Sequence, residues 1–372
     1  MTKLRLPIPD RPAATQCLWS GNLPAITRGV WCEWKWSWLL ICLARSTLAV
    51  CGRRWITGEE RLTRNGAQAE LVALLDLGSN ASRFLLARVV AGDGYHVLRK
   101  ERVQTRLGDG PTGRLRPAAV EATLDSVHRF LRRVSTGQAP RVLAIATAAV
   151  RDATNRDLLL DALREREGIA VRVLTGSEEA HLGAQAVLRS LPVRNGIVAD
   201  LGGGSLQLTR IRTKQIGWSV SLPLGAIRLT HRFLLGDPPT PDEVRALRGE
   251  VRKRVLQVFP AGRPADRLVG LGGTVRSLAR IHLASESGGR SRHGLRLQPS
   301  DVAAIRNQLE RLPGRLRQQV PGLKAERADT ILAGILVLEE LMSLFGHDAD
   351  LTVCTAGVRD GLLWREAFGV MT

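Results

Sequence analysis

The sequence predicts an α/β protein built from two structurally related halves. One motif occurs twice, at 71–90 and at 196–211: an apolar run, Asp-Leu-Gly, small residues and a second apolar run. Because the turn chemistry and both flanking strands recur, the two copies indicate duplicated units that face each other. A third strand, glycine turn and helical pattern follow at 267–281. The 372 residues, 44% of them hydrophobic, suffice for one large domain or two ordinary ones.

The first seventy residues differ in composition from the rest. Six of the eight tryptophans and four of the five cysteines lie before residue 56, without a sustained helical or strand period. The apolar run 36–51 is broken by Arg45 and is short for a membrane span. It also starts too far into the chain for a signal peptide. We therefore expect 1–70 to be a poorly ordered extension or a stretch translated from a misassigned start, rather than a membrane anchor.

Each copy of the repeated motif predicts a hairpin. In the first copy, 71–76 and 83–90 are strands that flank the turn 77–80. In the second copy, 196–200 and 206–211 flank the turn 201–205. Turns of this kind expose backbone N–H groups, and glycine lets a phosphate approach them closely.

An aspartate ends the first strand of each hairpin, so it would lie beside that phosphate. Two anions are stable side by side when a divalent metal lies between them. Asp76 and Asp200 are therefore candidates to hold Mg²⁺, directly or through water. The alternative is that each aspartate only caps its turn. Two facing copies favour the metal.

A helix is predicted to begin after Thr175. Thr175 and Glu178 fit a capping box, which gives Glu178 a structural role and leaves Glu179 free. The glycine turn at 272–273 precedes another helical pattern, and a strand, turn and helix N-terminus in this order suit an anion.

The net charge of +19 comes almost entirely from arginine, since the chain has only six lysines. Either the partner is a polyanion or the genome favours arginine codons. No helix-turn-helix, RNA-recognition signature or zinc finger is visible, which argues against a specific nucleic-acid partner. The five cysteines include no CxxC pair, so a zinc site is not expected and a reducing cytoplasm is the default location.

Together these segments resemble the exopolyphosphatase and guanosine pentaphosphate phosphohydrolase (Ppx/GppA) family of the actin-like ATPase superfamily. Motifs similar to those of the family occur in order from residue 71 to residue 365. They are LLDLGSNASRFLLARV (73–89), ATAAVRDATNRDLL (146–159), VLTGSEEAHL (173–182), VADLGGGSLQL (198–208), SLPLGAIRLTHRF (221–233), VGLGGTVRSLARI (269–281), the pair His293-Gly294, ERADTILAGILVL and GVRDGLL.

The resemblance implies two ribonuclease-H-like (actin-like) lobes with the active site in the cleft between them. Domain I would span 71–184 and domain II 185–372, and the last helix could pack back on domain I. The family's proposed catalytic base is the glutamate before the alanine of TGSEEA, which is Glu179 here. A carboxylate can accept a proton from water that attacks in line with the leaving oxygen.

The resemblance also implies the residues that surround the phosphate. The expected phosphate-binding residues are Ser79, Asn80, Arg83, Arg151, Gly202, Gly203, Gly204, Ser205, Gly272, Gly273 and Thr274. His293, in a basic loop, would either meet the distal part of a long polyanion or be solvated. Gln207 stands where the family carries a glutamate implicated in metal binding. Its amide oxygen can still join Asp76 and Asp200 at Mg²⁺, but it contributes no charge.

The first hypothesis is therefore a cytoplasmic exopolyphosphatase that uses Mg²⁺ or another divalent cation to release terminal phosphate from inorganic polyphosphate. A guanosine pentaphosphate phosphohydrolase is an alternative, since both substrates present a terminal phosphoanhydride. A weakly active or non-catalytic sensor is a third hypothesis, motivated by Gln207. An actin-like sugar kinase shares the hairpins but fits TGSEEA and SLPLGAIRLT less well. Neither a membrane nor a specific nucleic acid is expected as partner, and a homodimer is compatible because dimers are common in the family.

Overall fold

The computed structural model describes residues 69–110, 113–134, 139–259, 267–284, 289–345 and 350–369. The expected extension 1–70 lies outside the described residues except for its last two, which begin the first strand. All described residues belong to one compact unit of the chain, Leu62–Thr372. Among them, no helix is both long and apolar enough to cross a bilayer.

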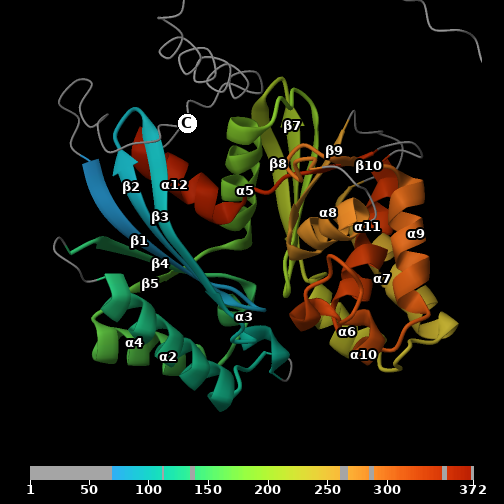
Figure 1. The fold of residues 1–372 in the computed structure, drawn as a ribbon, viewed down its shortest axis with the longest axis horizontal. Helices are drawn as coiled ribbons and strands as arrows, with labels where there is room; N and C mark the ends of the chain where they lie inside the picture. Colours follow the sequence, from blue (N-terminus) through green and yellow to red (C-terminus); the bar gives the residue numbers. More distant parts are fainter. Residues whose placement is uncertain are drawn as a thin grey trace, which may run out of the picture. The chain divides into compact units, whose positions relative to one another are not determined.

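The first of two sheets has five strands in the order β3-β2-β1-β4-β5 (Figure 1). β1, β2 and β3 pair antiparallel, whereas β4 and β5 continue the sheet in parallel on the other side of β1. β1 lies in the middle of the sheet and is covered on both faces, so its apolar run is buried. The strands are β1 (Ala69–Leu77), β2 (Ser82–Val90), β3 (Gly94–Val103), β4 (Arg141–Ala146) and β5 (Val171–Val173).

The second sheet repeats this arrangement. Its order is β10-β11-β9-β6-β7-β8, in which β6, β7 and β8 pair antiparallel and β9 and β11 continue in parallel. The repeat confirms the duplicated α/β architecture that the two sequence motifs predict. The strands are β6 (Gly196–Leu201), β7 (Leu206–Arg212), β8 (Gln215–Leu222), β9 (Leu268–Gly272), β10 (Arg296–Leu297) and β11 (Leu351–Val353).

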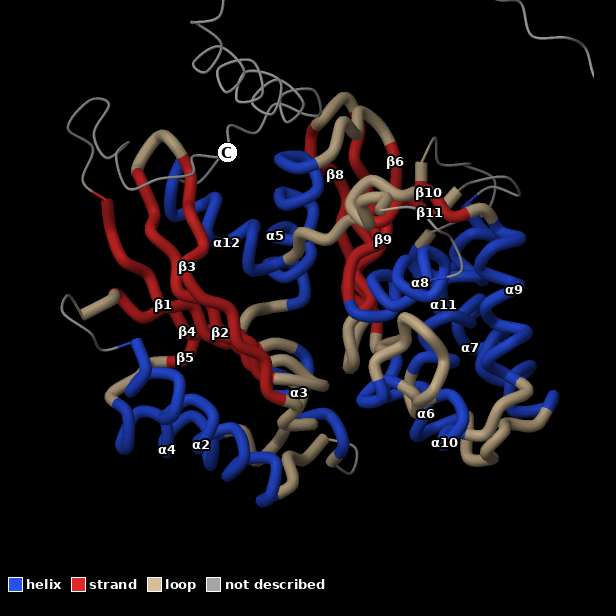
Figure 2. Tube along the Cα trace, viewed as in Figure 1, coloured by secondary structure: helices blue, strands red, loops and turns tan. Residues whose placement is uncertain are grey.

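Helices cover both faces of the first sheet (Figure 2). α2 (Pro117–Val134) and α4 (Asp157–Glu167) bury their apolar residues against one face. The C-terminal helix α12 (Val358–Phe368) packs on the opposite face, where Leu362 and Leu363 join the core formed with β1 and β2. The end of the chain thus returns to the sheet with which the described part begins.

Helix α5 (Gly176–Ser190) packs against β6, β7 and β8 of the second sheet, and against α12. The predicted capping box at its start is confirmed, because the Glu178 carboxylate accepts the Thr175 N–H at 2.8 Å and the Thr175 hydroxyl accepts the Glu178 N–H at 3.2 Å. The domain boundary expected at residue 184 falls inside this helix.

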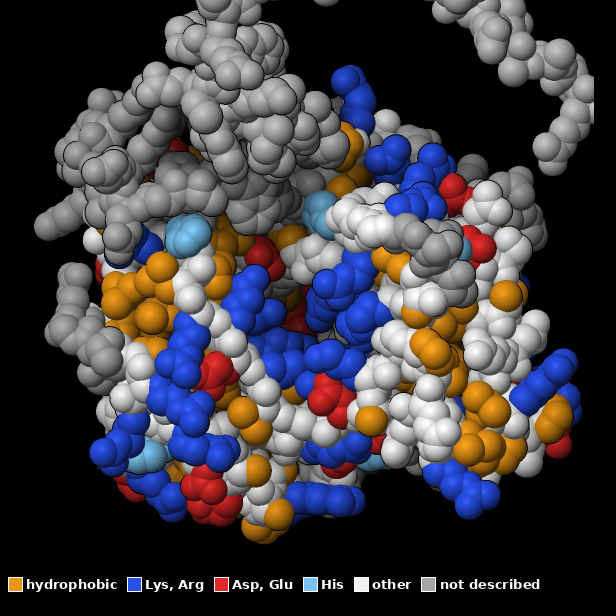
Figure 3. Space-filling view, in the orientation of Figure 1, with side chains coloured by type: hydrophobic (Ala, Val, Ile, Leu, Met, Phe, Trp, Pro, Cys, Tyr) orange, Lys and Arg blue, Asp and Glu red, His pale blue; other side chains and the backbone are white. Residues whose placement is uncertain are grey.

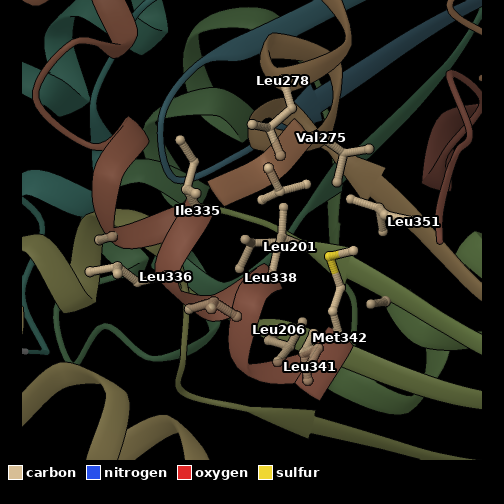
Figure 4. Close-up of a cluster of buried hydrophobic side chains, with 14 of the residues drawn as sticks. Leu201, Leu206, Val275, Leu278, Ile335, Leu336, Leu338, Leu341, Met342 and Leu351 are labelled. Atoms are coloured by element: carbon tan, nitrogen blue, oxygen red, sulfur yellow. The ribbon is translucent and has the colours of Figure 1, made fainter. Parts of the chain in front are cut away.

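The core of the second half centres on α11 (Ile331–Phe345), which is buried on nearly all sides and accordingly almost wholly apolar. Figure 4 shows its Ile335 and Leu338 among side chains from the sheet and α8, including Leu201 and Val275. Short segments α10 (Gly314–Arg317) and η2 (Ala325–Arg327) precede α11. The surrounding helices are α6 (Ala226–Phe233), α7 (Pro241–Val258), α8 (Gly273–Ala284) and α9 (Pro299–Glu310).

Candidate active site

Both hairpin turns and the third glycine turn meet at one pocket, which encloses about 890 Å³ including the space at its open mouth. Figure 3 shows Lys and Arg side chains gathered around a hollow in the face that is viewed. Most of the residues that the sequence marks as site candidates line this pocket. They are Asp76, Ser79, Asn80, Arg83, Glu179, Asp200, Gly202, Gly203, Gly204, Ser205, Gly272 and Gly273.

The two hairpin turns touch each other, and this contact depends on glycine. A Cβ at Gly204 would lie 2.8 Å from the Ser79 hydroxyl and 2.9 Å from Ala148 in the short helix α3 (Ala148–Arg151). A Cβ at Gly203 would lie 3.1 Å from the Ser79 Cβ. Real Cβ atoms essentially never approach within 3.0 Å, and a contact at 3.1 Å would force the neighbour to move, so the glycines allow the turns to close on one another. The two predicted phosphate cradles thereby become one site.

The third glycine turn needs glycine for a backbone reason as well. Gly272 has a φ of 97°, in the left-handed region that residues with a Cβ rarely adopt. A Cβ at this position would also collide with the Leu201 carbonyl, next to Asp200. β9 can therefore end close to the second hairpin turn and start α8 at the pocket wall.

The Glu179 carboxylate lies in the first turn of α5 and is 7% exposed. Burial raises its pKa to about 7, and the nearby charges of Asp200 and Asp76 add to the rise, whereas Arg151 opposes it. Arg151 donates a hydrogen bond to the carboxylate at 3.0 Å and a second one to the Leu174 carbonyl at 3.0 Å. A carboxyl group with a pKa near neutrality suits proton transfer at physiological pH.

The two aspartates have different surroundings within the pocket. Asp76 forms an ion pair with Arg83 at 3.1 Å, directly across the β1–β2 ladder, and lies 3.7 Å from Arg359. Burial raises the pKa of Asp200, although the charges of Arg276 and Arg83 counteract this rise. Asp76, Glu179, Asp200 and Asp360 therefore line the pocket together with four arginines.

Three pocket arginines were not assigned a role from the sequence. Arg276, Arg327 and Arg359 line the pocket from α8, η2 and α12. Burial and neighbouring arginines lower the pKa of Arg276 to about 10 and that of Arg327 to about 9. Burial also lowers the pKa of Arg359. Arg276 could be predicted from the sequence, because it lies in the first helical turn after Gly272-Gly273, and a helix start of this kind suits an anion.

Several sequence candidates lie outside the pocket lining. Arg151 contacts Glu179 rather than the open space. Thr274 is buried and packs so tightly that a Cβ at Gly334 would collide with it. Gln207 is 1% exposed, and its amide nitrogen donates to the Ser205 and Ser221 hydroxyls at 2.7 and 3.0 Å.

His293 is not fully solvated, which was one of the two roles considered for it. Its Nδ1 accepts the Thr355 N–H at 3.2 Å, so Nε2 carries the proton and donates to the Ser190 carbonyl at 2.9 Å. The ring therefore connects the C-terminus of α5 to Thr355, which lines the pocket.

Comparisons with known proteins agree with this arrangement. The sequence matches the Ppx/GppA phosphatase family over residues 85–368. It is 30% identical to exopolyphosphatase 1 of Mycobacterium leprae over 303 residues, which cover 79% of this chain and 89% of that protein. It is 32% identical to exopolyphosphatase 2 of Mycobacterium tuberculosis over 310 residues, covering 78% of this chain and 97% of that protein.

Solved structures show the same fold. A Ppx/GppA family member from Aquifex aeolicus superposes with a TM-score of 0.68 at 28% identity, covering 80% of this chain and 98% of that one. An exopolyphosphatase from Cytophaga hutchinsonii superposes with a TM-score of 0.73 at 25% identity, covering 81% and 99%. With its two actin-like halves, its paired glycine turns and a buried glutamate at the pocket, this chain belongs to the Ppx/GppA family of phosphoanhydride hydrolases.

Proposed function

We propose that the protein releases the terminal phosphate of inorganic polyphosphate. The observation that carries the proposal is the composition of the pocket wall. Four arginines, Arg83, Arg276, Arg327 and Arg359, line it, and none of the described lining residues has an aromatic ring. Guanidinium groups pair well with phosphate, whereas a nucleobase is commonly held by stacking on an aromatic ring. Such a wall suits a substrate whose units are all phosphates.

In this proposal the terminal phosphoryl group lies in the pocket, beside the contact between the two hairpin turns. Gly202 and Gly203 are partly exposed there, and Ser79 and Ser205 supply hydroxyl groups. Glu179 orients a water molecule and accepts its proton as the water attacks the phosphorus in line with the leaving oxygen. The arginines stabilise the charge on the transferred group and on the shortened chain that leaves.

The residues present fit a divalent cation such as Mg²⁺, which would be held by Asp76 and Asp200. No three His, Cys, Asp or Glu side chains of the described part of the chain converge into a complete metal site. Magnesium, however, commonly takes only one or two protein carboxylates together with phosphate oxygens and water. Such an ion supplies positive charge to the phosphate oxygens. Gln207 lies outside the pocket lining, so this proposal does not need it as a ligand.

Guanosine pentaphosphate is the alternative substrate, and steady-state kinetics on both compounds test the choice. We expect kcat/KM to be at least about tenfold higher for polyphosphate, because the wall offers charge but no ring for the guanine. A higher kcat/KM for guanosine pentaphosphate would overturn the assignment.

The same assay separates an enzyme from a sensor. Gln207 lies across the β6–β7 ladder from Asp200 and is tied to two serine hydroxyls. Since it is absent from the pocket lining, we expect turnover with Gln207 in place. Tight binding of polyphosphate with no phosphate release at any Mg²⁺ concentration would support the sensor instead, particularly if Gln207→Glu restored turnover.

A further inference from the structure

One row of charged side chains runs out of the pocket across the first sheet. Asp76 on β1 lies opposite Arg83 on β2, and Arg83 lies opposite Arg102 on β3. Directly paired residues point to the same face of a sheet, and neighbouring strands are about 4.8 Å apart. Arg83 lines the pocket and Arg102 does not, so Arg102 lies one strand further out, about 10 Å from Asp76.

A second row runs along α8. Arg276 lines the pocket from the first turn of this helix, and Arg280 follows four residues later on the same helix face. The Arg280 guanidinium is held in place, since Nε donates to the Gly322 carbonyl and Nη2 to the Ser277 hydroxyl, both at 2.9 Å. Arg280 therefore extends the α8 row beyond the pocket lining.

The outer members of the two rows both bond to the segment that precedes α11: Arg280 donates to the Gly322 carbonyl, and Arg102 forms an ion pair with Glu326. Burial lowers the pKa of Arg280, and the positive charges of Arg292 and Arg102 lower it further. Burial also lowers the pKa of Arg327, as do the charges of several arginines that include Arg102 and Arg280. Arg327 is part of the pocket wall, so it joins the pocket to the outer pair of arginines.

Glu326 is the carboxylate that faces this group of arginines. It forms an ion pair with Arg102, and its backbone carbonyl accepts the Gln104 amide at 3.0 Å. Only one nitrogen of Arg102 is engaged in that ion pair. Its Nη2 is buried without a hydrogen-bond partner among the described residues. A buried N–H group without an acceptor is costly, so Arg102 is short of one oxygen ligand.

Two pairs of like charges lie close together in these rows. Like charges directly opposite each other on paired strands destabilise a sheet, as Arg83 and Arg102 do. Like charges four residues apart destabilise a helix, as Arg276 and Arg280 do. Such conflicts are expected at functional sites, where a bound partner offsets them. The partner that offsets several guanidinium groups in a row is an extended polyanion.

We propose that Arg102 and Arg280, joined to the pocket through Arg327, form a second phosphate-binding subsite for the interior units of a polyphosphate chain. This inference rests on the proposed function and adds a dependence on chain length to it. A phosphate unit at the subsite supplies the missing acceptor to Arg102 and competes with Glu326. A short chain with its end in the pocket stops before the subsite, whereas a long chain occupies both.

The experiment measures phosphate release from tripolyphosphate and from long-chain polyphosphate by wild type, Arg102→Gln and Arg280→Gln. We expect kcat/KM on the long chain to fall about tenfold in each variant, as for the loss of a charge-assisted hydrogen bond, and to stay within about twofold on tripolyphosphate. Arg245→Gln is the matched control, because Arg245 is an exposed arginine on α7. It should change neither value.

Equal losses on both substrates would overturn the subsite, because the arginines would then act on the pocket or the fold. No loss on either substrate would overturn it too. The proposed function has its own readout, which is whether wild type releases phosphate from tripolyphosphate at all. If it does not, binding of fluorescently labelled long-chain polyphosphate by wild type and the two variants still decides whether the subsite exists.

A variant that is expected to bind the long chain more tightly provides a test that misfolding cannot mimic. Glu326→Gln removes the carboxylate that competes for Arg102. We expect the KM for long-chain polyphosphate to fall about threefold and the KM for tripolyphosphate to remain unchanged. A higher KM for the long chain would contradict a competition between Glu326 and the substrate.

Discussion

At the residue scale, the proposed chemistry depends on the environment of one carboxylate. Glu179 and Glu178 are adjacent in the sequence, yet their surroundings separate them. Glu178 caps α5, and hydrogen bonds from Thr175 hold its pKa below the usual range. Glu179 points into the pocket, where burial raises its pKa to about 7. The capping box thus engages one glutamate in the structure and leaves the other available for the proposed chemistry.

Arg151 tunes this group without lining the pocket. Its positive charge lowers the pKa of Glu179, so Arg151→Gln should raise that pKa. Because the base must be ionised to accept a proton, the acid limb of the pH–rate profile should move to higher pH. We expect kcat/KM at pH 7 to fall about tenfold and to recover partly at pH 9. Arg151→Lys keeps the charge and should shift the limb less. An unchanged limb in Arg151→Gln would contradict this role.

The pocket-lining residues that lie within local motifs can be predicted from the sequence. Glu179 and the glycine turns are recognisable because each motif combines a strand or helix end with a fixed spacing. Arg276, Arg327 and Arg359 escaped assignment because they come from three separate elements of an arginine-rich chain. The direction of a buried side chain was equally out of reach. Gln207 shares a motif with the second turn, yet it is absent from the pocket lining, and its amide nitrogen donates to Ser205 and Ser221.

At the scale of elements, the site depends on close approach between the two hairpin turns. The strands next to these turns could be predicted, because β1, β2, β6 and β7 are apolar runs that flank Asp-Leu-Gly. The outer strands β3 and β8 were not predicted. Many of their residues are partly exposed, as in the sequence GYHVLRKERV of β3, so no continuous apolar run marks them.

Gly204→Ala tests the contact between the turns. The added methyl group would press on Ser79 and Ala148, so the turns would have to separate. We expect kcat/KM to fall more than about tenfold, because displacements of this size around a reacting group are costly. The matched control is Gly249→Ala on α7, where nothing lies within 4 Å of the new Cβ. This change should leave activity intact and raise stability by roughly 0.5–1 kcal/mol. Full activity of Gly204→Ala would show that the turns need not touch.

At the scale of the whole molecule, one sheet order is used twice but the two copies have diverged. Across the first sheet the row is Asp76, Arg83 and Arg102, whereas the corresponding row of the second sheet is Asp200, Gln207 and Ser221. Each copy keeps its aspartate and its glycine turn. Only in the first sheet is the aspartate followed by arginines across the neighbouring strands. In the second half, the arginines Arg276 and Arg280 lie on α8 instead. Duplication therefore explains why each half contributes an aspartate and a glycine turn to the pocket, and divergence explains where the arginines lie.

The central claim is that Glu179 is the base of a phosphoanhydride hydrolysis. Its most direct test is phosphate release from polyphosphate by Glu179→Gln, with Glu178→Gln as the neighbouring control. We expect kcat to fall by about 10²- to 10⁴-fold in Glu179→Gln, the usual contribution of a general base. The control should stay within about threefold of wild type, since glutamine also serves in a capping box. Undiminished phosphate release by Glu179→Gln would contradict the account.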